Sequence, residues 1–320
     1  MISIDEVRNL YESELIDQLK GLEDKRKKVR NIYLLAILAV IGCISNYYHH
    51  ELNGNPSIAQ YVFFAVPVLL YFHGKGKKDH YTEIYKREVV SKIVSVFNSE
   101  WTYYAHKSIS PEEYYASDLF RKSYDRYKGD DLITGTIDKT NFRCSELHTE
   151  YKTTTTDSKG RTRTQWHTIF KGLFFHADFN KHFSGKTYVT PDFMENWLGK
   201  LGQKFQNIGG KGKLVKLENP EFEKLFVVHS TDQQEARYIL TPKIMEALVN
   251  LKREHGRDIH ISFVENRVYC AFLFSDELFE PRIFSSGVNF DDIEKMYDLI
   301  SINHQIIQEL NLNTRIWTKE

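Results

Sequence analysis

Two apolar runs near the N-terminus dominate the pattern of hydrophobic and polar residues. They cover Ile32–Ile44 and Ile58–Phe72, and no charged residue occurs in 31–50 or in 53–73. A membrane-spanning helix needs about 20 mostly apolar residues, and both runs reach that length if their flanking Tyr and Asn residues lie at the interface. A soluble helix usually keeps a polar stripe. The pattern therefore predicts a transmembrane hairpin; the alternative is two buried helices of a soluble core.

Basic residues lie on the outer sides of the two runs and are missing from the segment HHELNGNPS between them. Because short loops rich in Lys and Arg stay in the cytoplasm, we expect both termini in the cytoplasm and that segment outside. The basic flank is also expected to contact anionic lipid headgroups. Its members are Lys25, Arg26, Lys27, Lys28 and Arg30 before the first run and Lys75, Lys77 and Lys78 after the second.

Helical periodicity continues on both sides of the predicted hairpin. In 3–28 and in 80–104, apolar residues recur at spacings of three and four, which predicts two amphipathic helices. These helices either pair as a short antiparallel coiled coil or pack separately. Ser110 and Pro111 predict the start of a further helix that runs to about Tyr127, and Gly129-Asp130-Asp131 predicts a turn.

The pattern changes to alternation from Leu132 onwards. Residues 132–178 read as strands joined by hairpins, with a polar tip at YKTTTTDSKGRTRTQ that should project into solvent. A second hairpin is predicted across Glu265-Asn266-Arg267, and helices are predicted at 242–253 and 291–310. Clustered strands with hairpin connections predict an α+β fold with a mainly antiparallel sheet and flanking helices.

These elements predict four segments in the 320-residue chain. Residues 1–30 form an amphipathic cytoplasmic helix, 31–73 the transmembrane hairpin, 74–110 a juxtamembrane helix, and 111–320 a cytoplasmic α+β domain. The chain has 43 basic and 43 acidic residues, so it lacks the electrostatic footprint of a nucleic-acid-binding protein. Its three cysteines, Cys43, Cys144 and Cys270, form no CxxC pair, and we expect the last two to be small buried residues in strands.

Candidate chemistry is sparse. His148, His167, His176 and His182 lie in one strand-rich stretch with Glu146, Glu150 and Asp178, and such side chains can bind metals. However, His167 and His176 are an odd number of residues apart, so a regular strand would point them to opposite faces. We expect ordinary structural histidines, no metal site and no cofactor.

The polar string STDQQEARYIL lies between a predicted buried strand and a helix. We interpret Asp232, Glu235 and Arg237 as structural or partner-contact residues, and we expect Arg237 to tie elements together through charge-assisted hydrogen bonds. Glu218 and Glu223, in the nearby string VKLENPEFEKLF, are candidates of the same kind.

Several longer strings resemble a bacterial family of unknown function, DUF3137, from about Tyr114 to the C-terminus. They are YKGDDLITG at 127–135, SELH at 145–148, FKGLFFHADFNKHF at 170–183, VKLENPEFEKLF at 215–226, STDQQEARYILTP at 230–242 and LNLNTRIWTK at 310–319. The resemblance implies two spans before a cytoplasmic domain in the bacterial inner membrane, with a LemA-type membrane protein as a possible partner. It implies no reaction and no catalytic residue.

Together these observations predict an inner-membrane protein whose cytoplasmic domain is a binding or scaffold module. The alternative is a membrane-tethered enzyme acting on a lipid-derived or envelope substrate. A deep cleft with converging titratable groups would favour the enzyme, whereas an exposed apolar patch would favour partner binding.

Overall fold

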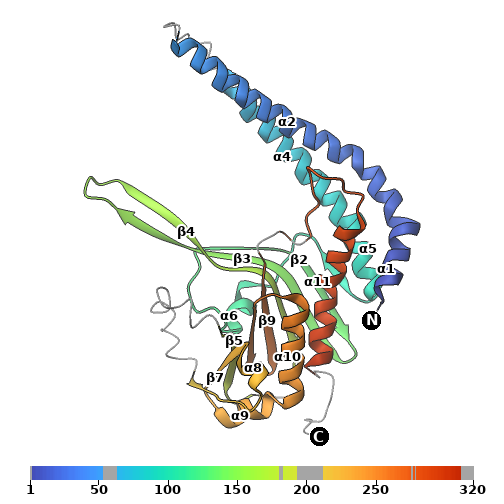
Figure 1. Cartoon of the computed structure of the whole chain (residues 1–320), viewed down its shortest axis with the longest axis vertical. Helices are drawn as coiled ribbons and strands as arrows, with labels where there is room; N and C mark the ends of the chain where they lie inside the picture. Colours follow the sequence, from blue (N-terminus) through green and yellow to red (C-terminus); the bar gives the residue numbers. More distant parts are fainter. Residues whose placement is uncertain are drawn as a thin grey trace. The chain divides into compact units, whose positions relative to one another are not determined.

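The structure is a computed structural model that describes residues 2–52, 63–179, 183–192, 212–274, 277 and 279–310. The chain divides into two compact units. One unit, here called the helical unit, takes in Ile2–Val96 and Phe279–Tyr297; the other, the sheet unit, takes in Phe97–Leu278 and Asp298–Glu320. The predicted helix 3–28 and the first apolar run belong to one continuous helical stretch of the helical unit (Figure 1).

Ser3 begins that stretch with a capping box, because its hydroxyl accepts from the amide of Glu6 while the Glu6 carboxylate accepts from the amide of Ser3. The helices of this unit are α1 (Ile4–Leu10), the π-helical turn η1 (Tyr11–Leu15), α2 (Ile16–Leu52), α4 (Ala65–Tyr85), the π-helical turn η2 (Lys86–Val90) and α5 (Ser91–Phe97). The second apolar run begins outside the described residues and continues into α4.

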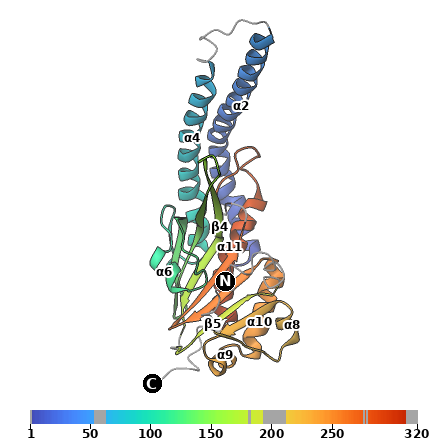
Figure 2. The ribbon, with the colours of Figure 1, turned by 90° about the vertical axis from the view of Figure 1, so that its left-hand side faces the viewer.

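Helices α2 and α4 lie side by side and run in opposite directions (Figure 2). The Tyr33 and Tyr71 rings are 6.3 Å apart, while Cys43, ten residues further along α2, donates to the carbonyl of Phe63, 3.3 Å away. Gly74 allows the close approach, because a Cβ there would lie 3.0 Å from Ile32 Cγ2. Beyond the apolar runs, Lys92 and Glu14 form an ion pair of 2.6 Å, so the two amphipathic stretches also pair.

Among its described residues, the sheet unit contains a nine-stranded sheet in which every neighbouring pair is antiparallel, as the hairpin pattern predicts. The spatial order is β1-β2-β3-β4-β9-β8-β5-β7-β6. The strands are β1 (Thr102–Tyr104), β2 (Arg126–Ile137), β3 (Thr140–Thr156), β4 (Thr162–Asp178), β5 (Lys186–Pro191), β6 (Lys213–Leu214), β7 (Phe226–Ser230), β8 (Ile259–Val264) and β9 (Arg267–Leu273).

Strands β3 and β4 extend beyond the rest of the sheet as a long ribbon (Figure 1). From Tyr151, paired with His167, to Thr156, paired with Thr162, the two strands pair with each other and leave most side chains exposed. The predicted projecting hairpin is therefore confirmed, and residues 151–167 are called the arm below. Cys144 on β3 and Cys270 on β9 are fully buried, as expected.

Helices cover both faces of the sheet (Figures 1 and 2). On one face, Ile109, Tyr114 and Leu119 from α6 (Pro111–Ala116) and its flanks pack into an apolar cluster with side chains of β2, β3, β4, β8 and β9. The other face carries α10 (Pro242–His255) and the second half of α11 (Phe290–Glu309). The short helices α8 (Pro220–Glu223) and α9 (Gln233–Ile239) flank β7.

Three predicted elements differ from the structure. The helix expected to reach Tyr104 ends at Phe97, because residues 102–104 pair with β2 as strand β1. The helix from Ser110 ends at Ala116 instead of about Tyr127, since Asp118 has a φ of 51° and the Ser117 hydroxyl bonds the Tyr114 carbonyl. The turn predicted at 129–131 is instead a bulge inside β2, between Asp130 and Ile133.

The remaining helices agree with their sequence signals. Asp232 caps α9, Thr241 caps α10 with a proline at its first turn, and Gly256 ends α10 in the left-handed region with a φ of 60°. The C-terminal helix predicted at 291–310 is α11.

Candidate functional site

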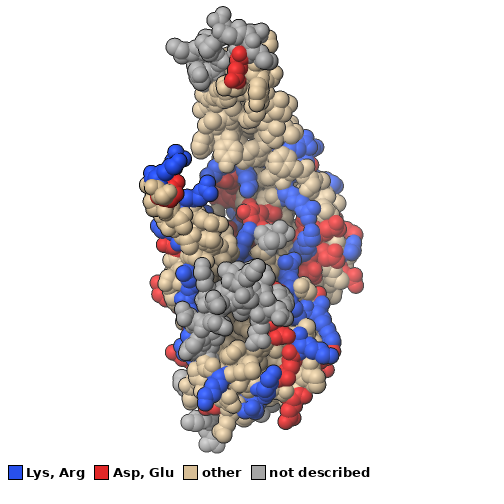
Figure 3. Space-filling model, turned by 60° about the vertical axis from the view of Figure 1, so that its left-hand side comes forward, with Lys and Arg blue, Asp and Glu red and all other residues tan. Residues whose placement is uncertain are grey.

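A band of exposed apolar side chains covers α2 and α4 in the helical unit. Leu69 is 68% exposed and Leu38 is 62% exposed, although such side chains are normally buried. Figure 3 shows this stretch as a surface almost without charged residues. Its members are Leu34, Leu35, Ile37, Leu38, Val40, Ile41 and Ile44 on α2 and Val66, Val68, Leu69, Tyr71 and Phe72 on α4. Contiguous apolar surface of this kind marks a membrane or protein interaction site.

Within the described residues, the helical stretch Ile4–His49 is long and apolar enough to cross a membrane. In its most apolar window 17% of the residues are buried, whereas the core helix of a soluble protein is mostly buried.

The basic flank divides into exposed and buried members. Lys25, Lys27, Lys28, Lys75 and Lys77 are exposed, and Arg30 and Lys78 are half-buried. Figure 3 shows blue side chains below the uncharged stretch. Arg26 differs from the prediction: it is 3% exposed and therefore does not face lipid. The helical spacing explains this, because Arg26 continues the buried stripe of Leu19 and Leu22.

Arg26 holds a loop of the same unit against α2. Its Nε and Nη2 donate to the two carboxylate oxygens of Glu23 at 2.8 and 2.7 Å, and its Nη1 donates to the carbonyl of Ile283 at 2.5 Å. The hydrogen bonds from Arg26 lower the pKa of the Glu23 carboxyl. The adjacent Phe284 is 64% exposed, and its ring lies 6.3 Å from that of Tyr33. No sequence signal pointed to this loop, because an isolated Ile-Phe pair between Arg282 and Ser285 has no periodicity.

In the sheet unit, the string STDQQEARYIL forms a tie between α9 and β5. Glu235 accepts from the amides of Ser184 and Gly185 at 3.0 and 2.7 Å, and Asp232 accepts from the amides of Gln234 and Glu235. Arg237 is exposed and donates to the carbonyl of Gln233, one turn earlier. The tie expected of Arg237 is therefore made by Glu235, and its partners are backbone amides rather than a charged side chain.

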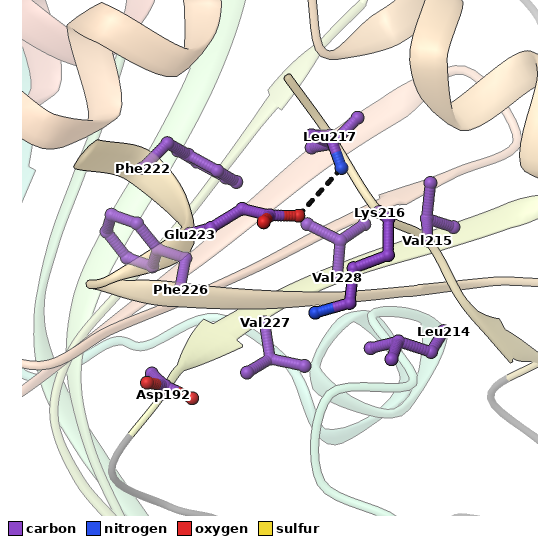
Figure 4. A pocket seen from close by; sticks show the side chains of 10 residues that line it. All are labelled: Asp192, Leu214, Val215, Lys216, Leu217, Phe222, Glu223, Phe226, Val227 and Val228. Carbon is purple, nitrogen blue, oxygen red and sulfur yellow. Dashed lines mark hydrogen bonds between the residues drawn. The ribbon is translucent and has the colours of Figure 1, made fainter. Parts of the chain in front are cut away.

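Glu223 lines a small pocket between β6, β7 and α8 (Figure 4). Its carboxylate points to the amide of Leu217, which donates to it at 2.8 Å, whereas Glu218 is exposed. The pocket encloses about 80 Å³, which is room for a few water molecules. Glu223 thus closes a loop of the VKLENPEFEKLF string, and the pocket is too small for a substrate.

A row of polar side chains crosses five neighbouring strands beneath α6. The register places Arg143 beside His176, His176 beside Tyr269, Tyr269 beside Ser262, and Ser262 beside Tyr188. Because alternate residues of a strand share a face, this row could have been read from the sequence only with the strand register in hand.

Helix α6 meets one end of this row through Glu113. Its Oε1 lies 2.6 Å from Arg143 Nη1 and 3.3 Å from His176 Nε2, and the contact with His176 lowers the pKa of Glu113 to about 2. His176 is 3% exposed, and neither Nδ1 nor Nε2 of its ring makes a hydrogen bond of regular geometry among the described residues. Burial lowers the pKa of His176 despite the nearby carboxylate, so the ring is neutral at pH 7.

Asp118, two residues after the end of α6, meets the other end of the row. Asp118 accepts from the Tyr188 hydroxyl at 2.6 Å and from Arg121 Nε at 2.8 Å. Burial opposes ionisation of Asp118, but hydrogen bonds from Arg121, Tyr188 and Lys186 together lower its pKa to about 2. The two carboxylates therefore fasten the α6 segment to the sheet.

The histidines proposed as metal candidates do not converge. His148 lies 3.8 Å from Glu150, His167 bonds the Thr153 hydroxyl at 2.8 Å, and His182 lies outside the described residues. Asp178 lies 3.6 Å from Arg267.

A different group brings carboxylate oxygens of Asp130, Asp131 and Glu146 within 4.8 Å of one another. The Tyr103 hydroxyl donates to Asp131 within this group. Acidic clusters are common without an ion, so these three residues alone do not define a metal site.

Part of the chain, mostly within the sheet unit, matches a known protein family. Residues 168–312 match the family of proteins of unknown function, DUF3137. This is the family that the sequence strings resemble, and the match covers that segment of the chain. The match begins after both apolar runs, so it does not bear on the two spans.

Comparison with known structures adds little. The crystal structure of the mycobacterial trehalose monomycolate transport factor A, TtfA, is similar over 68% of this chain and 97% of that chain, with 8% identity and a TM-score of 0.31. A likeness at that level carries no argument about fold or function. No curated protein matches the chain.

Proposed function

We propose that the chain is an inner-membrane protein with two spans, α2 and α4, and a cytoplasmic α+β domain that acts as a binding or scaffold module. The observation that carries the anchoring is the apolar band on both helices, where Leu38 and Leu69 are more than half exposed. In water such a band would be costly at about 25 cal/mol per Å². The charge-free band ends where exposed lysines begin, as at the boundary between hydrocarbon and headgroups.

The Lys and Arg asymmetry supports the orientation. Exposed lysines lie before the apolar run of α2 and after that of α4, which favours a cytoplasmic position for both outer ends. The same lysines support contact with anionic headgroups, at about 1 kcal/mol for each basic side chain near the surface.

The arm supports a binding role. Between Tyr151 and Thr156 on β3, and the paired residues of β4, the outer edge of neither strand has a partner strand among the described residues. Unpaired strand edges are templates for an added strand from another chain. Trp166, 38% exposed and stacked under the Arg126 guanidinium, offers an aromatic contact near the base of the arm.

The enzyme alternative lacks comparable support. Its expected sign is a deep cleft with converging titratable groups. The pocket beside Glu223 encloses about 80 Å³, and the titratable side chains that line a larger, open hollow of about 590 Å³ are Lys213 and Asp232. His176 and Glu113 are titratable and adjacent, but Glu113 belongs to α6 itself and His176 is buried beneath that helix. A partner is the better-supported role, and a LemA-type membrane protein is the first candidate, from the family resemblance.

The experiment combines extraction with copurification. Membranes containing the full chain are washed with alkaline carbonate, solubilised, and the copurifying proteins identified by mass spectrometry. The matched control is a variant whose arm is shortened by removing 154–164 and joining the strands with Asn-Gly. We expect the chain to resist carbonate and its partner to be lost from the control. Release of the chain by carbonate, or the same partners on both variants, would contradict the proposal.

A further inference from the structure

The loop before α11 presents two apolar side chains beside the apolar band. Ile283 and Phe284 line a groove of about 860 Å³ together with Tyr33, Pro67, Tyr71 and Lys78 of α2 and α4. All of these residues belong to the helical unit. We infer that this groove seats an anionic phospholipid, with an acyl chain against Phe284 and the phosphate at Lys78. The inference deepens the proposed function and rests on the membrane anchoring argued there.

Buried charged residues hold the loop in place, and this fixed position keeps Phe284 exposed. Arg26, 3% exposed, donates to the Ile283 carbonyl, and Glu23 accepts from the amide of Gly287 at 3.4 Å. Glu280, earlier in the same loop, pairs with Lys86 of η2 at 2.8 Å, and the Lys86 side chain is 3% exposed. Burying two cations to fix a loop is expensive unless each is paired, as here.

Although the loop is fixed, the Phe284 side chain does not pack into a hydrophobic core. It is 64% exposed, close to the exposure of Leu69 on the apolar band. Its ring lies 6.3 Å from that of Tyr33, which in turn lies 6.3 Å from that of Tyr71. Aromatic rings of this kind prefer the interface between headgroups and acyl chains. The three rings therefore mark the level at which a lipid chain would enter the groove.

The charges around the groove favour a lipid over a protein segment. The groove lining includes one cation, Lys78, and no acidic side chain. Lys78 is half-buried, with exposed Lys75 and Lys77 three residues and one residue before it. An acyl chain suits the apolar wall, because it brings no backbone polar groups that would need hydrogen-bond partners there. A phosphate suits the cation at the rim.

The test uses the full chain in phosphatidylcholine vesicles with 20 mol % of a lipid brominated in its acyl chains. Ser285, exposed beside Phe284, is changed to Cys and labelled with bimane; native Cys43, Cys144 and Cys270 are buried, and unsubstituted protein gives the background. The probe lipid is either brominated phosphatidylglycerol or brominated phosphatidylcholine. A label at Tyr238, 44% exposed on α9, is the reference position.

We expect brominated phosphatidylglycerol to quench the label at 285 well above the reference position, with an apparent affinity about fivefold that of brominated phosphatidylcholine. Lys78→Gln should remove the preference between the two lipids, and Phe284→Ser should weaken quenching by both. Neither change should unfold the protein, because both side chains are partly or largely exposed.

Equal quenching by both lipids, no quenching by either, or no effect of the two substitutions would overturn the inference. Cross-linked dimers through position 285 would also overturn it, because a second copy would then fill the groove. Flotation with the vesicles is recorded in the same samples. A chain that fails to float contradicts the membrane anchoring itself, whereas a chain that floats without quenching contradicts the lipid seat alone.

Discussion

The guanidinium of Arg26 lies 2.5 Å from the carbonyl oxygen of Ile283, 257 residues later in the chain. This contact ties the start of the chain to the loop before α11 within one unit. By sequence, Arg26 is one of five basic residues in a run of six; by structure, it is a buried cation paired with Glu23. Arg26 therefore has a structural role that the exposed lysines beside it do not share, although these side chains have similar chemistry.

Replacement of Arg26 by Ala should destabilise the protein strongly. The change leaves the Glu23 carboxylate and the Ile283 carbonyl without their donor, and loss of one member of a buried pair costs about 3 kcal/mol or more. Thermal unfolding of the detergent-solubilised full chain measures the effect. Lys27→Ala, at an exposed neighbouring position, is the matched control and should change stability by about 0.5 kcal/mol or less. Equal melting temperatures for the two variants would show that the Arg26 contacts add nothing.

Glu235→Ala should destabilise the sheet unit, whereas Arg237→Ala should not. Glu235 accepts from two amides of the segment before β5, and hydrogen bonds to a charged group contribute about 1.5–3 kcal/mol each. Arg237 is exposed and bonds its own helix. Chemical denaturation of the two variants, two residues apart, gives the comparison. A larger loss for Arg237→Ala would restore the role that the sequence suggested for it.

Acidification should weaken the fold through His176. Its folded-state pKa is lowered below the ordinary value of 6.5, so the unfolded chain binds the proton first and stability falls as the pH drops through about 6.5. The charged groups that face the ring are Glu113 on α6, Arg143 on β3 and Arg267 on β9, and of these the carboxylate alone favours the protonated form. Glu113 itself has a pKa of about 2, so its contribution is lost only below about pH 4.5.

The measurement is the difference in unfolding midpoint between pH 7.5 and 5.5. His176→Gln should show a smaller difference than the natural protein, whatever its stability at pH 7.5. His167→Gln, on the exposed arm, should keep the full difference. An unchanged pH dependence in His176→Gln would mean that this ring is not the buried neutral base described here.

The sequence predicted the helices and strands better than the side-chain contacts between them. Caps such as Ser3, Asp232 and Thr241 and the hairpin at Glu265 act locally, so their residues carry the signal. The end of the α6 helix at Ala116 was missed because it depends on Asp118, whose carboxylate is held by Tyr188 seventy residues away. The His176 and Glu113 contact was missed for the same reason, since it requires the strand register.

A charge placed in the apolar band should impair insertion. Leu69→Arg introduces a cation at the most exposed apolar position of α4, at a cost of about 2.5 kcal/mol or more on the insertion scale. Leu69→Ala is the control for loss of the side chain. The fraction of each variant that survives carbonate washing is compared. Full retention of Leu69→Arg would mean that α4 does not cross the bilayer.

The orientation of the two apolar helices is the central claim, and a pair of reporter fusions tests it most directly. A reporter active only outside the cytoplasm is fused after Asn53, between the two runs, or after Glu320. Two spans with both outer ends in the cytoplasm predict activity from the first fusion and none from the second. Activity from the fusion after Glu320, or silence from the fusion after Asn53 in a stably expressed protein, would contradict the account.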